Sequence, residues 1–399
     1  MKIQWKIVCF LLISGSVLAG EVQTVNNGKT VSGKTETLEF VEDLVIGPET
    51  EEDHLIWASF LTTVDADSKG NMFVCDPGEN RVVEFDSEGK FVRSIGRKGE
   101  GPGEFLNLKS FQVLDNGTAI AFEQAQILTT LNYYDKALNY RDKKVHQSFE
   151  LIPTTALFSR NGEWISSTVA SVNMTTQMTA IHYAILNQDL EIKKDLIVYE
   201  TPNFNPQRLM ESEYWSEYLA GNMKQTSKGL LAFVAFGKDG SVYTAKADRY
   251  EIQKLDSKLN PVQVIKKAYD PIPMTKEQID AMVEPISERI LGNLPAQLQS
   301  VVTEKTIAKA VKMAEFPPVH FPISNLLALE NGYLLVLHEV DMVKDIAKVD
   351  IFNPAGVYVG SCEHGFRSLE KMVFKNGYAY TIENRDDDNT LVRYKINIK

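Results

Sequence analysis

The chain has 399 residues, of which 44% are hydrophobic, so it is long enough to bury a large core. Its formal net charge is -11 at pH 7. An acidic surface argues against binding to nucleic acid or to anionic membranes, because both interactions need basic surface stripes. The charge therefore predicts no nucleic-acid partner.

The N-terminus has the pattern of a secretory signal peptide. Lys2 and Lys6 form a short basic region before the apolar run 7–18, which is too short to span a bilayer. Val17 and Ala19 are the small residues at positions -3 and -1, so we expect cleavage after Ala19. No other segment is apolar enough to cross a membrane. The sequence thus predicts an exported protein, periplasmic or extracellular, without a membrane span.

The next segment, 20–35, is polar and rich in glycine, and we expect it to be a flexible leader. Residues 60–105 then contain four short alternating runs, each ended by turn residues, as in one blade of a β-propeller. A single blade cannot bury its own faces, so one blade implies several more.

Five further copies of the blade follow from a repeated turn that ends in glycine. Asn-Gly and Asp-Gly favour tight hairpins because both residues tolerate positive φ. The turn glycines are Gly70, Gly117, Gly162, Gly240, Gly332 and Gly377. A short β-rich run follows each glycine and is interpreted as the second strand of a blade. The count predicts six blades over residues 36–399.

The last repeat provides only three strands before Lys399. An unpaired sheet edge would expose a row of backbone donors and acceptors. The spare strand at 37–47 can pair with that edge. The predicted fold class is therefore all-β: a six-bladed β-propeller closed by an N-terminal strand.

The stretch from Asp65 to Phe105 resembles the NHL-type repeat of six-bladed propellers. The residues that carry this resemblance are Gly70-Asn71, Val74-Cys75-Asp76, Asn80-Arg81-Val82, Phe85-Asp86, Gly89-Lys90-Phe91 and the turn 99–105. NHL repeats usually place a proline soon after that turn, whereas this chain has Leu108. The layout is similar to exported six-bladed propellers of bacteria. The resemblance implies a fold, and it implies little about activity.

Two long insertions, 201–228 and 271–319, connect the outer strand of one blade to the next blade and are predicted to be helical. The helix in the first insertion is expected to stop at Gly221, and a capping box formed by Thr275 and Gln278 begins the helix in the second. Connections of this type share one face of the disk, so we expect a partial helical cap there. The apolar helix faces either pack on the blades or help to form a binding surface.

Counting six residues beyond each turn glycine selects a ring of polar side chains on the capped face. The positions are Asp76, Glu123, Thr168, Lys246, His338 and Glu383. Asp76, Glu123, His338 and Glu383 are oxygen and nitrogen ligands that suit a divalent cation such as calcium, and Lys246 suits an anion or a carbonyl. The alternative is that these residues cap their own turns, as the residue at Asp76 commonly does in such repeats.

The aromatic side chains Tyr214, Trp215 and Tyr218 of the first insertion are further candidates for ligand contact. No strong catalytic motif is present. The sequence therefore predicts an exported, non-catalytic propeller that binds a ligand or a protein partner on its capped face, with no required cofactor. The alternative is a metal-assisted hydrolase or lyase, because lactone-hydrolysing and lyase propellers place metal ligands around such a channel.

Cleavage after Ala19 would leave two cysteines, Cys75 and Cys362. The blade count places them on non-adjacent blades. It predicts two separate buried thiols in place of a disulfide.

Overall fold

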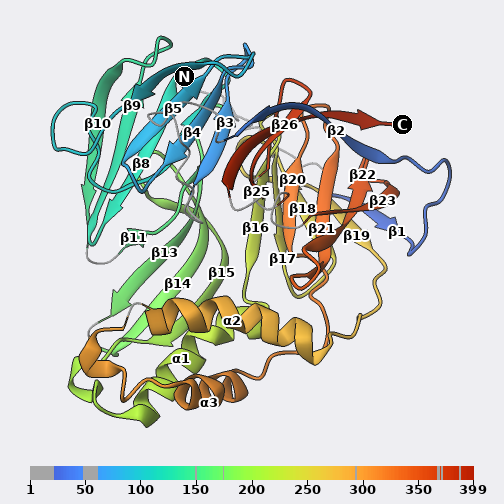
Figure 1. Ribbon diagram of the computed structural model, residues 1–399. Coiled ribbons are helices and arrows are strands. Elements are labelled where there is room, and N and C mark those ends of the chain that lie inside the picture. Colours follow the sequence, from blue (N-terminus) through green and yellow to red (C-terminus); the bar gives the residue numbers. More distant parts are fainter. Residues whose placement is uncertain are drawn as a thin grey trace, which may run out of the picture.

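The computed structural model describes residues 22–47, 62–148, 151–173, 175–292, 294–365, 369, 372–385 and 388–399 (Figure 1). The predicted signal peptide and its cleavage site lie outside these residues. The described strands form six separate sheets, which confirms the six-bladed propeller.

The first three blades follow each other along the chain. Blade 1 consists of β3 (Thr63–Ala66), β4 (Met72–Asp76), β5 (Arg81–Phe85) and β6 (Phe91–Ile95). Blade 2 consists of β7 (Leu108–Val113), β8 (Ala119–Ala125), β9 (Leu128–Tyr134) and β10 (Tyr140–Gln147). Blade 3 consists of β11 (Ile152–Pro153), β12 (Leu157–Phe158), β13 (Ile165–Asn173), β14 (Met178–Leu186) and β15 (Ile192–Pro202). Because β11 and β12 both pair with β13, they share the role of the innermost strand.

The other three blades complete the ring. Blade 4 consists of β16 (Ala232–Phe236), β17 (Val242–Lys246), β18 (Glu251–Leu255) and β19 (Pro261–Lys267). Blade 5 consists of β20 (Asn325–Ala328), β21 (Leu334–Asp341), β22 (Ile346–Phe352) and β23 (Tyr358–Gly365). Blade 6 consists of β24 (Val373–Lys375), β25 (Tyr378–Arg385), β26 (Asp388–Ile398) and β2 (Leu38–Ile46).

The six turn glycines all have positive φ, between +74° and +87°. This left-handed conformation is strained for other residues and is required by the tight turn between the first two strands. The turn chemistry therefore explains why the blade count could be made from glycine positions alone.

The ring closes between the two ends of the chain. β2 pairs antiparallel with β26 and supplies the outer strand of blade 6, so both terminal segments share one sheet (Figure 1). The His364 ring of blade 5 stacks on Phe40 of β2 with a 4.6 Å centroid separation. The N-terminal strand is thus held by its backbone pairing and by packing against the preceding blade.

The prediction that 20–35 is a flexible leader is wrong for the described residues, which begin at 22. β1 (Gln23–Asn27) pairs in parallel with β19 as a fifth strand of blade 4. The Asn27 side chain donates to the backbone carbonyl oxygens of Lys266 and Gly356 and accepts from the amide of Tyr358. Backbone pairing at a free sheet edge orders a segment whose composition suggests flexibility.

The hydrophobic core lies in the seams between adjacent blades. Five of the six seams contain ten or more buried apolar side chains each. Among the described residues, the seam between blades 3 and 4 has three fully buried apolar side chains, Ile185, Val242 and Leu255, with partly buried ones packed around them. Burial of apolar side chains at about 1.5–3 kcal/mol each is the main stabilising term in such seams, so this seam is the least filled.

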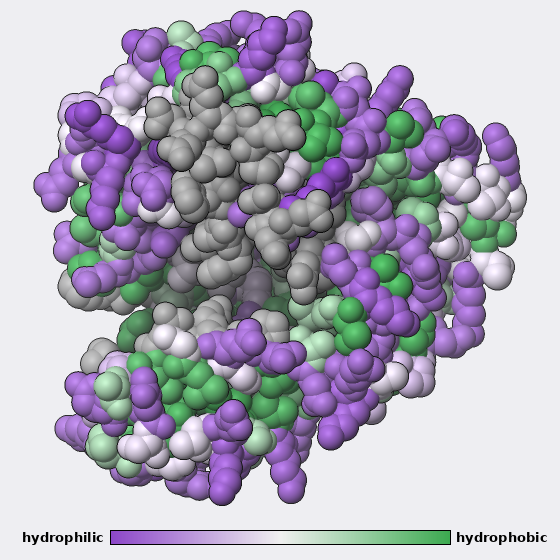
Figure 2. All heavy atoms as spheres, viewed as in Figure 1, coloured by the Kyte–Doolittle hydropathy of each residue, from purple (hydrophilic) through white to green (hydrophobic). Residues whose placement is uncertain are grey.

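Three helices lie on one face of the disk, along the lower edge of Figure 1. α1 (Ser212–Ser227) connects blades 3 and 4, and α2 (Lys276–Gly292) and α3 (Glu304–Ala314) connect blades 4 and 5. Short 3₁₀ turns occur at Pro206–Arg208 and Ala296–Leu298. Successive strands of a blade are antiparallel, so this face also carries the turns between second and third strands. It is called the helical face below, and Figure 2 shows a hollow between the helices and the blades.

The helices begin largely as their capping signals predict, but α1 ends later. The amide of Thr275 donates to Gln278 Oε1 and the amide of Gln278 donates to Thr275 Oγ1, which completes the predicted capping box. Gln278 also donates to Asp341 Oδ2 and so attaches α2 to blade 5. Gly221 does not stop α1, which continues to Ser227. An added Cβ at this position would lie 3.6 Å from Pro202 Cδ, an ordinary contact distance, so the packing does not require a glycine there.

Candidate functional site

The six innermost strands surround a cavity of about 340 Å³ on the propeller axis. β3, β7, β12, β16, β20 and β24 all contribute lining residues, so the cavity belongs to the whole ring. Ligand pockets are typically roughly 300–1,000 Å³ in volume. This central cavity is therefore the candidate binding site.

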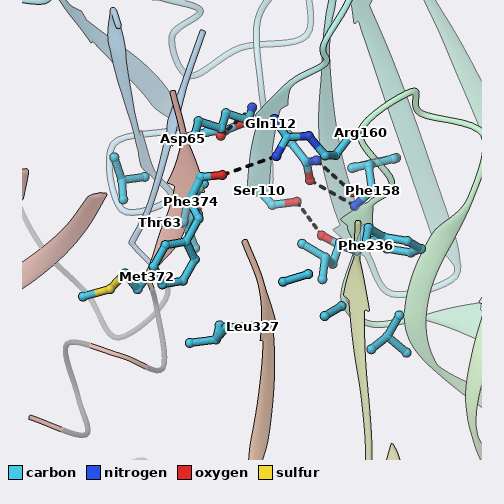
Figure 3. Close-up of a pocket in the computed structure, with 18 of the residues that line it drawn as sticks. Thr63, Asp65, Ser110, Gln112, Phe158, Arg160, Phe236, Leu327, Met372 and Phe374 are labelled. Atoms are coloured by element: carbon cyan, nitrogen blue, oxygen red, sulfur yellow. Dashed lines mark hydrogen bonds and ion pairs between the residues drawn. The ribbon is translucent and has the colours of Figure 1, made fainter. Parts of the chain in front are cut away.

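The walls of the central cavity are mainly apolar. Phe236, Leu327, Met372 and Phe374 lie around it in Figure 3, on three different blades. Leu157 also lines the cavity, and its side chain is 46% exposed although it is large and apolar. Covering such a side chain with an apolar ligand is favourable because apolar surface leaves water.

Polar side chains in the wall are already used to join neighbouring blades. Gln112 of blade 2 donates to the Phe158 carbonyl oxygen at 2.8 Å and accepts from the Phe158 amide at 3.0 Å (Figure 3). Ser110 donates to the Ala156 carbonyl oxygen at 3.2 Å. These bonds satisfy backbone groups that the open edge of an inner strand leaves exposed, and they leave the wall apolar in character.

Arg160 closes the end of the cavity opposite the helical face. Its guanidinium lies 3.0 Å from Asp115 of blade 2 and 2.5 Å from Glu330 of blade 5, and it donates to the Phe374 carbonyl oxygen of blade 6 at 3.3 Å. Lys238 of blade 4 lies 3.6 Å from Glu330. One side chain of blade 3 thus connects blades across the axis, and Figure 3 shows its bond to Phe374.

A buried ion pair lies beside this network. Lys375 Nζ of blade 6 is 2.8 Å from Asp65 Oδ1 of blade 1 and donates to the Val113 carbonyl oxygen of blade 2. The Asp65 carboxylate also accepts from the amides of Ala66 and Val113 at 2.8 and 2.7 Å. Both charged side chains are buried, and their contacts hold together blades 6, 1 and 2, which include the seam where the ring closes.

The polar ring predicted from the sequence lies elsewhere. All six of its residues lie in second strands, which are one strand farther from the axis, and none of the six lines the central cavity. The structure therefore does not bring them together around the channel.

Asp76 and Glu123 hold loops of the helical face. Asp76 is fully buried, accepts from the Glu79 amide at 3.3 Å and lies 3.4 Å from Arg81. Burial raises the pKa of its carboxyl, and the bond from Glu79 and the charge of Arg81 oppose this shift. Glu123 accepts from the Leu106 amide at 2.8 Å and fixes the end of the loop 96–107. Asp76 thus caps its own turn, as the alternative interpretation expected, whereas Glu123 holds an earlier loop.

His338 belongs to a buried polar cluster between blades 4 and 5. Its Nε2 lies 3.3 Å from Asp350 Oδ2, which also lies 3.0 Å from Lys267 Nζ and accepts from Tyr250 Oη. Burial would raise the pKa of the Asp350 carboxyl, but His338, Lys267 and Tyr250 together hold it below its usual value. Glu339 Oε1 lies 3.2 Å from His338 Nδ1. His338 is 4% exposed, so it does not face the helical surface. Blades 4 and 5 are joined here by the contacts of Lys267 and Tyr250 with Asp350.

The other three ring residues have separate surroundings. Glu383 accepts from Arg385 and from Tyr394 Oη at 2.9 and 2.7 Å. Thr168 lines a small cavity in the seam between blades 3 and 4. Lys246 is exposed and lines two further cavities at the outer part of the same seam.

No group of three His, Cys, Asp or Glu side chains in the described part of the chain is arranged to hold a metal ion. Asp76, Glu123, His338 and Glu383, the four candidate ligands, lie on blades 1, 2, 5 and 6 and have protein partners of their own. A metal bound by these four residues therefore has no geometric support.

The aromatic cluster is part of a separate helical core. Tyr214 and Trp215 are 5% and 8% exposed and pack with Ile307 and Ala310 of α3. Trp215 Nε1 donates to the Leu209 carbonyl oxygen at 2.8 Å, and Tyr218 stacks on Tyr214. The apolar faces of α1 and α3 pack on each other, whereas the sequence suggested packing on the blades or a binding surface. The rings of Tyr214 and Trp215 are therefore buried and do not lie on the surface.

The charged residues near the axis could have been identified in the sequence by a count backward, and not forward, from each turn glycine. Asp115, Arg160, Lys238, Glu330 and Lys375 all stand two residues before a turn glycine. This position is the end of an innermost strand, where the ring is narrowest, so long charged side chains reach neighbouring blades. The signal is a charged side chain, of either sign, at one position in five of the six repeats.

Comparison with known proteins agrees with this architecture. Residues 18–201, slightly under half of the chain, match the model of family DUF5128, described as "6-bladed beta-propeller". No curated protein matches the chain. None of the described helices has the length and apolar character needed to cross a membrane.

Several solved structures are similar to the whole chain. A putative exported protein from Bacteroides fragilis shares 10% identity, with 94% of this chain and 100% of that chain covered and a TM-score of 0.49. A member of the duf4221 family from Bacteroides vulgatus shares 10% identity, with coverage of 91% and 98% and a TM-score of 0.47. A streptogramin B lyase shares 8% identity, with coverage of 92% and 98% and a TM-score of 0.40. With its six sheets and the matched family model, the chain is a six-bladed β-propeller.

Proposed function

We propose that this chain is an exported, non-catalytic binding protein that takes a small, largely apolar ligand into its central cavity from the helical face. The main support for this proposal is the central cavity, which is lined by apolar side chains from all six blades. Concave, mostly apolar sites with a few polar groups are the usual form of small-molecule sites.

The direction of entry is supported by the ion pairs at the far end. Arg160, with Asp115, Glu330 and Lys238, connects the blades across the axis there. The helices and the longest connections lie at the other end, and loops of this kind commonly carry binding sites.

Export is supported by the N-terminal sequence alone. Lys2 and Lys6, the apolar run 7–18 and the small residues before position 20 form a signal-peptide pattern. The alternative of a metal-assisted hydrolase or lyase stays a prediction from resemblance, because no described feature favours it.

The proposal is tested by filling the cavity. Leu157→Trp adds volume at a side chain that is already 46% exposed, so the extra atoms enter the cavity without repacking the core. The probe is N-phenyl-1-naphthylamine, a neutral apolar dye that fluoresces when it leaves water. We expect the unmodified protein to bind it with one-to-one stoichiometry and Leu157→Trp to weaken binding at least tenfold.

The matched control is Val262→Trp, at an apolar side chain on the outer strand of blade 4 that is 41% exposed. It should bind the dye as the unmodified protein does. Equal binding by both variants, or no saturable binding by the unmodified chain, would remove the central cavity as the ligand site.

A further inference from the structure

The seam between blades 3 and 4 is open on its helical side. Its few buried apolar residues, Ile185, Val242 and Leu255, lie towards the opposite face, since Val242 begins β17 and Leu255 ends β18. The same seam contains three cavities of about 240, 260 and 320 Å³. The two outer ones, beside Lys246 and Arg249, lie towards the helical side.

These cavities adjoin the central cavity. The innermost of them shares Ala156, Leu157 and Val234 with the central cavity. It also shares Leu196 with both outer cavities, which have Lys246 and Arg249 in common. The four cavities thus form a series from the axis outward along the seam, which is called the groove below.

The chemistry of the groove changes along its length. The axial end is apolar, as described above. The middle is lined by hydroxyl side chains, including Thr155, Ser167, Thr168 and Tyr183. Tyr183 Oη accepts from Gln225 of α1, so the helical layer is attached beside the groove.

The outer end carries two lysines, Lys194 and Lys246, that form no close ion pair among the described residues. The nearest effect is on the Asp248 carboxyl, whose pKa is lowered by Arg249 and, to a smaller extent, by the charge of Lys246.

The carboxylates at this end have polar partners other than these two lysines. Asp195 Oδ1 lies 2.9 Å from His182 Nδ1, Asp248 pairs with Arg249, and Glu251 with Lys266. In a chain of net charge -11, a groove end with two spare ammonium groups favours a ligand anion.

From this gradient we infer that the ligand is an elongated amphipathic anion: its apolar part occupies the central cavity and its carboxylate lies at Lys194 and Lys246. This inference rests on the proposed function. The path crosses two to three strands of blade 4 at about 4.8 Å each, so the ligand spans on the order of 10–15 Å. A medium-length fatty carboxylate has this length and polarity.

The test compares three probes of one chain length: decanoate, decanol and decylammonium. Each displaces N-phenyl-1-naphthylamine from the protein at pH 7.5, below its micellar concentration. We expect decanoate to displace the dye at roughly tenfold lower concentration than decanol, and decylammonium to be the weakest. The double variant Lys194→Gln/Lys246→Gln should bring decanoate to within about threefold of decanol and leave decanol unchanged.

The control is Lys193→Gln/Lys258→Gln, which removes the same charge. Lys193 neighbours Lys194 but pairs with Glu191 and lines none of the three cavities. Lys258 lies in the turn between β18 and β19, on the far face of blade 4. This variant should keep the preference for decanoate.

The possible failures are distinguishable. If decanoate and decanol compete equally, or if the two lysine double variants behave alike, the anion inference is wrong while the central cavity stands. If the dye does not bind, or if Leu157→Trp has no effect on its binding, the proposed function itself is wrong, and the anion inference that rests on it falls with it.

Discussion

Replacing Lys375 by methionine should destabilise the ring at its closing seam. The substitution removes the ammonium that lies 2.8 Å from Asp65 Oδ1 and keeps a side chain of similar length. Both partners are buried, with side-chain exposures of 8% and 4%. The change therefore leaves an uncompensated carboxylate between blades 6, 1 and 2.

The expected loss follows from these contacts. Removing one partner of a buried ion pair costs about 3–5 kcal/mol. Asp65 keeps its bonds from the Ala66 and Val113 amides, so we expect the lower end, about 3 kcal/mol. With an unfolding entropy of about 2.1 cal/mol/K per residue over 399 residues, the melting midpoint should fall by roughly 4 °C.

The assay is urea unfolding followed by circular dichroism, together with thermal melting. Lys90→Met is the matched control, because Lys90 is exposed and pairs only with exposed Glu88. Its midpoint should not change measurably.

A double variant with Asp65→Asn measures the coupling between the two charges. Its loss should be smaller than the sum of the single losses by at least about 1 kcal/mol. If Lys375→Met shifted the midpoint no more than Lys90→Met, the assignment of this pair to the stability of the ring would be refuted.

Three further outcomes are expected. Burial lowers the pKa of His364 despite the charges of Glu383 and Asp345, so its contribution to stability is complete above about pH 6.5 and is lost as pH falls through its native pKa. His364→Phe should therefore show a smaller fall in melting midpoint between pH 7.5 and 5.0 than the unmodified chain, and an equal fall would contradict this. Burial raises the pKa of Cys362 to about 11 and that of Cys75 further, so both thiols should react with a disulfide reagent at pH 8 much more slowly in native than in urea-unfolded protein. A chelator should leave the midpoint unchanged, and a fall of several degrees that calcium reverses would revive the metal interpretation.

The blade count could be predicted because its signal is local. Each turn glycine needs positive φ, and each following run alternates with period two, so six copies are visible without any long-range information. The two cysteines were correctly placed on separate blades for the same reason, and both are free. The capping box at Thr275 and Gln278 is likewise a local feature.

The sequence did not predict the site correctly because it does not show how far each strand lies from the propeller axis. Asp76 and Glu383 have the right position along their strands, but they lie one strand too far out to meet. Tyr214 and Trp215 have helical spacing that predicts an apolar face, and the sequence does not say what covers that face. In the structure α3, about 90 residues later in the chain, covers it.

The sequence by itself determined the six blades, the turn conformations and the face on which the helices lie, because these depend on neighbouring residues and on the alternation of strand direction. Only the tertiary structure decided which side chains meet. Arg160 reaches three blades because inner strands converge at the axis. The groove beside Lys246 exists because one seam of six is incompletely filled. Convergence and incomplete packing arise from the closed ring, and no single repeat contains them.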